Sequence, residues 1–326
     1  MIVPDHWAEA KQSIKHDGKS ITVRRFGWSN ESEDDAHKMA EARVAEAIER
    51  IKSGEKLAKR EPKVPYNGAD GVPIREEVLS RHDEEVISRN SYGAHCLNTP
   101  RALFADIDFD KEVPCGLTLT VWIVLAIGGL STGFIWFDWK TALMLVVVAA
   151  IFAYGIAKLL MNTYIILNGG INAMSRKRIR RFIAEHAGWG ARLYKTPNGL
   201  RLLATHRPFA ANEPEVDVLF KAIGVDPIYS RMCKKQACFR ARLTAKPWRI
   251  GIPHHMRPRP GTWPVNSERM PLRTAWVNEY DKKAEGYASC QFDSTIGKED
   301  IHEDIAPIVE LHDQRCRALD DSLEIA

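Results

Sequence analysis

The sequence predicts an α+β protein that a transmembrane helical hairpin holds in the bilayer, and two observations lead to this fold class. The first is a pair of long apolar stretches, one directly after the other, in an otherwise charged chain. The second is the order of elements on both sides of these stretches, which is strand, helix, strand, strand, helix, strand. That order is the ferredoxin-like βαββαβ arrangement, and the hairpin interrupts it after its first strand.

The composition outside the apolar stretches is that of a charged, soluble protein. The chain has 326 residues, 46 of them basic and 42 acidic, and a net charge of +4 does not by itself predict a polyanionic partner. Mean hydropathy is -0.28 although 45% of the residues are hydrophobic, which reflects the concentration of apolar residues in one block. The six cysteines lack the dense spacing of a disulfide framework, so reduced thiols in a cytosolic compartment are expected.

The two apolar stretches predict a pair of antiparallel transmembrane helices. No charged residue lies between Val113 and Phe137, and after the break at 138–140 the chain stays apolar as far as Lys158. Each stretch is long enough to cross a hydrocarbon core as a helix, which pairs its own backbone polar groups. The alternative is a helical hairpin buried in a soluble core.

The charges that flank the hairpin predict its orientation. Five cations follow the second stretch between Arg176 and Arg181, whereas the connecting turn carries only Lys140. Because positive flanks stay on the cytoplasmic side, both termini are expected in the cytoplasm, and the protein is expected to be a multi-pass protein of the inner membrane. The lipid bilayer is therefore an expected partner.

Helix caps, helix ends and apolar periodicity indicate the elements in the rest of the chain. A strand over 20–29 precedes an amphipathic helix that Ser32 caps and that ends near Gly54, and a short helix is predicted at about 74–81. The predicted segments are 1–60, a strand plus helix unit; 61–113, a loop-rich segment with the first core strand; 114–167, the hairpin; 168–250, the remainder of the ferredoxin-like domain; and 251–326, a C-terminal loop and helical segment.

Two pairs of charged residues alternate along predicted core strands. Asp106 and Asp108 share one face of the strand ALFADIDFD, and Arg240 and Arg242 share one face of the strand CFRARLT. We expect the two carboxylates on the open face of the sheet, where Mg²⁺ or Mn²⁺ would hold both of them ionised. The two arginines would then contact the phosphates of a metal-bound nucleotide.

These features resemble the archaeo-eukaryotic primase core, an RRM-like fold. The resemblance rests on Asp106-Ile107-Asp108 and on the hairpin YKTPNGLRLLATH, and it covers 103–110 and about 190–245. It implies metal binding by the two aspartates. It also implies a catalytic role at the position of a Ser-x-His motif, for which Arg201 and His206 are the candidates. Here Thr205 replaces the serine without a spacer, and no later acidic residue matches.

The whole chain also resembles a family of bacterial two-helix membrane proteins, on the segments PYNGADGVPIREE, RNSYGAHCLNTP and FRARLTAKPWR. This resemblance implies no activity. The leading functional hypothesis is metal-dependent binding or transfer chemistry on a nucleotide or nucleic acid. The alternative is a membrane-anchored scaffold or binding module without catalysis, in which the charged residues serve as surface ion pairs and turn caps.

Two further groups of residues carry side chains that could form a site. Cys233 and Cys238, with His254 and His255 downstream, could ligate zinc, although the spacing is unspecific. His312 and Asp313 adjoin on a predicted C-terminal helix, where neighbours in sequence point in different directions, so no catalytic pair is expected there.

Overall fold

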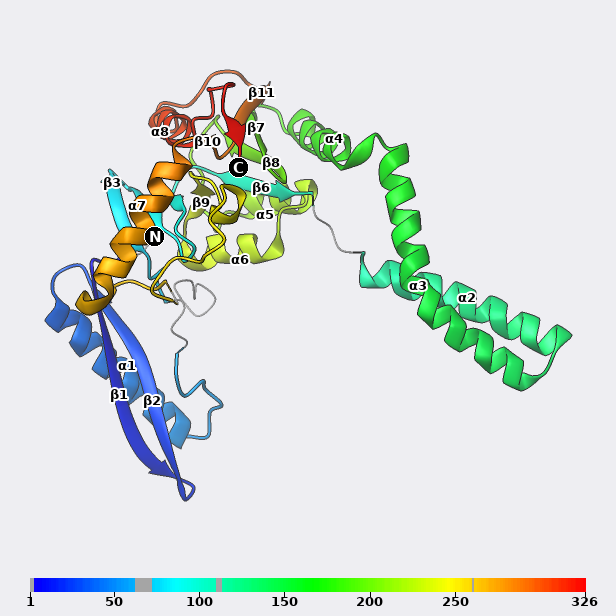
Figure 1. The fold of residues 1–326 in the computed structure, drawn as a ribbon, viewed down its shortest axis with the longest axis horizontal. Coiled ribbons are helices and arrows are strands. Elements are labelled where there is room, and N and C mark those ends of the chain that lie inside the picture. Colours follow the sequence, from blue (N-terminus) through cyan, green and yellow to red (C-terminus); the bar gives the residue numbers. More distant parts are fainter. Residues whose placement is uncertain (1–2, 62–71, 110–112, 260) are drawn as a thin grey trace.

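The computed structural model describes residues 3–61, 72–109, 113–259 and 261–326. Three parts are visible in Figure 1: a central body, an N-terminal unit on one side of it, and a long helical hairpin that extends away on the other. The body contains two four-stranded sheets and the remaining helices. The predicted α+β class with a helical hairpin is therefore confirmed at this level.

The N-terminal unit is a β-hairpin covered by one helix. The helix buries Ala40, Val44 and Ile48 against the hairpin. The Ser32 hydroxyl accepts a hydrogen bond from the Asp35 amide at 3.1 Å, which is the cap that the sequence predicts. The first strand was not predicted, because its apolar and charged residues alternate only weakly. The elements are β1 (His6–His16), β2 (Lys19–Ser29) and α1 (Glu33–Lys52).

The two apolar stretches form an antiparallel pair of helices that projects from the body (Figure 1). Both helices are long and apolar enough to cross a membrane. Large apolar side chains such as Phe134 and Ile151 are about two-thirds exposed, unlike those of a soluble core. Gly133 permits the close contact of the helices, because a Cβ atom there would lie 2.4 Å from the Ala142 Cα. The helices are α2 (Cys115–Trp136) and α3 (Trp139–Leu167).

One sheet of the body contains the strands on both sides of the hairpin. Its order is β11-β7-β8-β6, and every neighbouring pair is antiparallel. Ala105 and Ile107 point into the main hydrophobic core, which also contains apolar residues of α4 and α5. The elements are β6 (Phe104–Asp108), α4 (Gly170–Glu185), β7 (Gly190–Thr196), β8 (Gly199–Ala204), α5 (Pro214–Ile223) and β11 (Gln291–Gly297).

The second sheet, in the order β3-β4-β5-β9, includes strands that the sequence did not predict. The predicted helix at about 74–81 is wrong, because the chain there is a strand from Glu77 that pairs with its neighbour. His95–Thr99, for which no strand was predicted, is a central strand. The strands are β3 (Glu77–His82), β4 (Glu85–Arg89), β5 (His95–Thr99) and β9 (Phe239–Arg242).

The ferredoxin-like arrangement is not confirmed, because the expected fourth strand, β9, pairs with β5 instead of β6. Side chains bridge the two sheets where backbone pairing of β6 with β9 was expected. The Tyr229 hydroxyl lies 3.0 Å from the carbonyl oxygens of both Phe104 and Arg240, and Arg201 Nη1 donates to the Arg242 carbonyl at 2.8 Å. The two sheets therefore meet at β6 and β9 without a common ladder.

The C-terminal segment covers part of the sheet face that was expected to be open. The ring of His312 lies 5.1 Å from Phe104 and 4.7 Å from Tyr194, between centroids. Asp106 shares this face but remains accessible beyond the covered region, with 38% of its side chain exposed. The remaining elements are α6 (Pro227–Gln236), η2 (Pro247–Arg249), η3 (Ser267–Arg269), α7 (Met270–Ala284), β10 (Tyr287–Ala288), α8 (Ala306–Cys316) and β12 (Glu324–Ile325).

Candidate functional site

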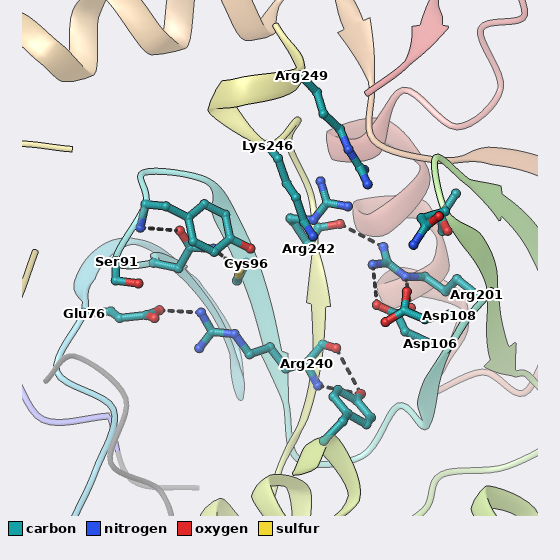
Figure 2. A pocket seen from close by; sticks show the side chains of 15 residues that line it. Glu76, Ser91, Cys96, Asp106, Asp108, Arg201, Arg240, Arg242, Lys246 and Arg249 are labelled. Carbon is teal, nitrogen blue, oxygen red and sulfur yellow. Dashed lines mark hydrogen bonds and ion pairs between the residues drawn. The ribbon is translucent and has the colours of Figure 1, made fainter. Parts of the chain in front are cut away.

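A cavity of about 550 Å³ lies where the two sheets meet, and Figure 2 shows the side chains that line it. Asp106 and Asp108 come from β6 and Arg201 from β8, in one sheet. Arg240 and Arg242 come from β9 in the other sheet. The structure thus brings together both predicted acids, both predicted arginines and one of the two candidate catalytic residues.

The end of β6 is positioned by the turn between β7 and β8. Asp108 pairs in register with Gly199. A Cβ atom at Gly199 would lie 2.0 Å from the Ile107 carbonyl oxygen, so only glycine permits this close approach of the two strands. The Asn-Gly turn therefore fixes Asp108 at the edge of the cavity.

Asp106 forms a two-bond ion pair with Arg201. Arg201 Nε donates to Oδ1 at 2.7 Å and Nη2 donates to Oδ2 at 3.0 Å. Burial alone would raise the pKa of Asp106, but the charge and hydrogen bonds of Arg201 outweigh it and lower that pKa. Asp106 is therefore an ionised carboxylate whose two oxygens are already engaged, and a metal ion there would have to share them.

Arg240 is held in a second ion pair. Its Nη2 donates to Glu76 Oε2 at 2.6 Å and its Nη1 to Asn98 Oδ1 at 3.1 Å, and only 11% of the side chain is exposed. Glu76 also accepts a hydrogen bond from the Ser88 hydroxyl at 2.7 Å. This network satisfies the buried guanidinium within the protein and makes Arg240 a structural part of the cavity wall.

Three other cations converge on the cavity, namely Arg242, Lys246 and Arg249, and we call them the cation cluster (Figure 2). Among the described residues, none of the three forms an ion pair with an aspartate or glutamate within 4.0 Å, and Arg242 Nη1 donates to the Thr244 carbonyl at 3.2 Å and to an oxygen of Ala326 at 3.5 Å. Burial, followed by the charges of Arg242 and Arg249, lowers the pKa of Lys246. Burial and then the charge of Arg242 lower the pKa of Arg249. The cluster thus carries positive charge that the wall only partly balances.

An aromatic hollow adjoins the cation cluster. Tyr92 lines both the cavity and this neighbouring hollow of about 300 Å³, which Trp248 also lines. The two rings meet edge to face with centroids 5.3 Å apart, and Lys246 Nζ lies 5.6 Å from the Trp248 ring centroid. A flat apolar ligand group could contact these rings while an attached anion reached the cation cluster.

His206, the other candidate catalytic residue, does not line this cavity. Its Nδ1 lies 3.1 Å from the Gly190 carbonyl oxygen, and its ring packs 4.4 Å from that of Trp189, between centroids. Burial lowers the pKa of His206. The residue therefore packs and makes a local hydrogen bond, away from Asp106 and Asp108.

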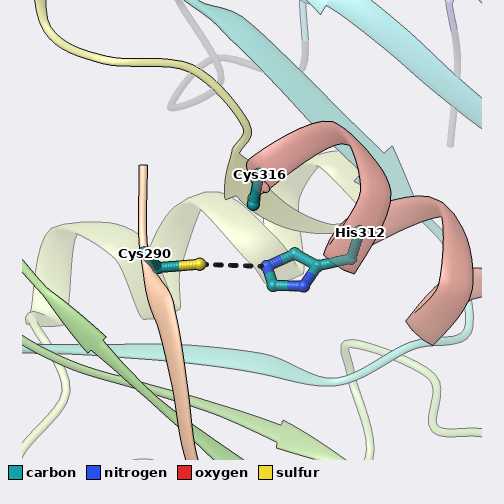
Figure 3. A group of neighbouring side chains, drawn as sticks. All are labelled: Cys290, His312 and Cys316. Carbon is teal, nitrogen blue, oxygen red and sulfur yellow. Dashed lines mark hydrogen bonds between the residues drawn. The ribbon is translucent and has the colours of Figure 1, made fainter. Parts of the chain in front are cut away.

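The predicted zinc ligands are not assembled in the structure. Cys233 and Cys238 are buried, whereas His254 and His255 are exposed and both line two hollows that neither cysteine lines. Among the residues that the structure describes, the group of possible metal ligands in mutual reach is Cys290, His312 and Cys316 (Figure 3).

Sequence reasoning missed these three residues as a group, although His312 and Cys316 are four residues apart on one helix face. It also missed Lys246 and Tyr92 as parts of the cavity, whereas for Arg249, as for Arg240 and Arg242, it left surface ion pairing and phosphate binding as alternatives. The run from Arg240 to Arg249, with four cations in ten residues, carried the signal for the cation cluster.

No protein-family model, curated protein or solved structure matches the chain. The interpretation of the cavity therefore rests on its own geometry and charge.

Proposed function

We propose that this chain is a membrane-anchored protein whose cytoplasmic part binds a phosphorylated ligand of nucleotide size in the cavity between its two sheets. The observation that carries the proposal is the convergence of Arg242, Lys246 and Arg249, which form no ion pair within 4.0 Å with an aspartate or glutamate among the described residues. Partly buried cations that repel one another gain free energy when an anion enters between them. Phosphate groups, with several acceptor oxygens, suit two guanidinium groups and an ammonium group.

The membrane part of the proposal is supported by the exposed apolar surface of α2 and α3. A hairpin with this surface is stable in hydrocarbon, whereas in water it would form an apolar patch far larger than soluble proteins tolerate. The cations of α4, which follow α3 directly, favour the cytoplasmic side of the inner membrane for the body and both termini. The cavity would then be in contact with the cytoplasm.

The size and lining of the cavity support a nucleotide over a simple phosphate. About 550 Å³ is within the usual range for small-molecule sites, and inorganic phosphate would fill a small part of it. Tyr92 and Trp248 offer ring surface for a base next to the cation cluster. A base on these rings and phosphates on Arg242, Lys246 and Arg249 would use both regions at once.

A divalent metal fits this proposal as a companion of the phosphates. Mg²⁺ commonly binds through one or two carboxylates together with substrate phosphates. Asp106 and Asp108 both line the cavity as carboxylates for Mg²⁺ or Mn²⁺, and Asp106 would share its two oxygens between the metal and Arg201. The order β7-β8-β6, with α4 and α5, supports an RRM-like core whose fourth strand is displaced into the second sheet.

The two-bond pair of Asp106 with Arg201 also favours a second candidate, a binding module without catalysis. A metal-dependent transfer enzyme needs carboxylates that can ligate metal, and here one of the predicted pair is already occupied. Binding would then serve to recruit or to sense the phosphorylated ligand at the membrane surface.

Equilibrium dialysis of a nucleoside triphosphate against the detergent-solubilised full chain tests the proposal. We expect saturable binding, a loss of at least about tenfold in affinity in Lys246→Ser, and no change in Lys235→Ser, which removes an exposed cation outside the cavity. The metal-dependent form predicts that the wild type needs Mg²⁺ to bind the triphosphate. Asp108→Asn, which lacks this carboxylate, should then bind without a requirement for Mg²⁺. Equal affinity in Lys246→Ser and the wild type would contradict the proposal.

A further inference from the structure

A second cluster of chemically active side chains lies behind Arg201, on the side away from the cavity. It consists of Cys290, between β10 and β11, and of His312 and Cys316 on α8 (Figure 3). One ligand atom from each residue lies within 4.8 Å of the other two, and all three side chains are almost completely buried. The proposed function does not use these residues.

The geometry points to a buried site for a soft divalent metal ion, Zn²⁺ above all, with Cys290 Sγ, His312 Nε2 and Cys316 Sγ as its ligands. Two thiolates and one imidazole form a donor set that selects zinc over hard cations such as Mg²⁺. With three protein ligands, one position of the zinc tetrahedron remains for a water molecule or a small exogenous ligand.

The histidine is oriented as a metal ligand would be. His312 Nδ1 lies 3.0 Å from Asp313 Oδ1, and Asp313 is in turn held by Arg192 at 2.7 Å. The expectation that His312 and Asp313 point apart is therefore wrong. A carboxylate on one ring nitrogen fixes the tautomer that leaves the lone pair on the other nitrogen, and this outer contact is usual for metal-binding histidines. His312 Nε2 is accordingly directed toward the thiols, 3.8 Å from Cys290 Sγ.

The charges around the cluster allow a neutral complex. Arg201 is paired with Asp106, and Arg192 with Asp313, so these four charges cancel in pairs. Two thiolates and one divalent ion then add no net charge to the buried region, which avoids most of the cost of burying an ion. Arg201 Nη1 donates to His312 Nε2 at 3.2 Å in the structure, and a metal on this nitrogen would replace that contact. Arg201 would retain the bonds of its Nε and Nη2 to Asp106, whereas Nη1, which also donates to the Arg242 carbonyl and lies 4.0 Å from Cys316 Sγ, would have to shift.

The burial of the cluster excludes a nucleophilic cysteine as the explanation of this geometry. Cys290, His312 and Asp313 lie in the order of a catalytic triad, yet Cys290 is fully buried beneath α8 and no substrate could reach its sulfur. A small ion needs only a transient opening of α8. The rings of Phe104 and Tyr194, which pack against His312, would then shield the bound ion from bulk solvent.

Metal analysis of the full chain, purified in detergent without chelator, tests the inference. We expect about one zinc per chain, and replacement by Co²⁺ should give the intense near-ultraviolet absorption of thiolate-to-cobalt charge transfer. Cys290→Ser and Cys316→Ser should each lose the metal and this absorption. Cys233→Ser, at a buried cysteine outside the cluster, should retain both.

The wild type supplies a readout that does not depend on the folding of variants. Zn²⁺ should raise its unfolding temperature and should slow the alkylation of two of its six cysteines, whereas Mg²⁺ should do neither. Absence of zinc and of any Zn²⁺ effect would overturn the inference, as would zinc that persists in both Cys290→Ser and Cys316→Ser. A disulfide between Cys290 and Cys316 in the purified chain would also overturn it, because it leaves no thiolates for the metal.

Discussion

The carboxylate of Asp293 connects the helix that follows the helical hairpin to the central body. Asp293, on β11, accepts hydrogen bonds from Arg176 of α4, one of them at 3.1 Å, and lies 3.3 Å from Lys195 Nζ. These contacts, led by the hydrogen bonds of Arg176, lower the pKa of Asp293 from 3.8 to about 2. The Asp293→Asn variant removes this stabilisation without changing the size of the side chain.

The magnitude follows from the pKa. The interval from 3.8 to about 2, at about 1.4 kcal/mol per pH unit, corresponds to about 2.5 kcal/mol of unfolding free energy at pH 7. Only 12% of the side chain is exposed, so solvent screening removes little of it. Because the folded-state pKa is the lower one, the contribution is complete well above pH 3.8 and is lost as the pH falls toward 2. About half should remain at pH 3.

Urea unfolding of the detergent-solubilised chain, followed by tryptophan fluorescence from pH 7 to pH 3, measures this difference between wild type and variant. Asp300→Asn is the matched control, since Asp300 is exposed and lies 3.8 Å from Lys298 Nζ. A difference below about 0.5 kcal/mol at pH 7 would refute the reasoning, because that is the size of a surface ion pair. So would a difference that does not change between pH 7 and pH 3.

Three further predictions follow from the same structure. Asp106→Asn should lower the unfolding free energy by about 2 to 3 kcal/mol in urea unfolding, because Arg201 keeps a charge that is no longer paired. The loss is smaller than for a fully buried pair, since water in the cavity reaches the site. An effect as small as that of Asp300→Asn would contradict this prediction. Gly199→Ala should cost at least about 2 kcal/mol in the same assay, since its Cβ atom would lie 2.0 Å from the Ile107 carbonyl oxygen. Gly188→Ala, with φ +85° but no atom within 4 Å of its Cβ, should cost less, because it adds only the backbone strain of the left-handed region. The chain should remain with membranes through washes at high salt and high pH and be released only by detergent; release by salt would show that α2 and α3 do not span the bilayer.

The elements that the sequence predicted correctly carry local signals. The Ser32 cap, the Asn-Gly turn before β8 and the two long apolar stretches each depend on residues that are neighbours in the chain. By contrast, β3 was expected to be a helix because its residues favour one locally, and pairing with β4 overrides that preference. The partners of β5 and β11 are distant in sequence, so no local pattern reveals them.

The candidate site also combines features that the local sequence predicts with features that depend on distant residues. Alternation along a strand correctly placed Asp106 beside Asp108, and Arg240 beside Arg242, because side-chain direction in a strand is a local property. The partners of these side chains come from other strands, so the engagement of Asp106 by Arg201 could not be predicted. The displacement of β9 into the second sheet, which separates the sheets around the cavity, likewise depends on long-range pairing.

The central claim is that the cation cluster binds a phosphorylated ligand, and calorimetric titration with pyrophosphate tests it most directly because this probe has no base. We predict saturable binding of one pyrophosphate per chain in the wild type, weakened at least about tenfold when both Arg242 and Lys246 are replaced by serine. No binding to the wild type, or equal binding to the double variant, would contradict the account.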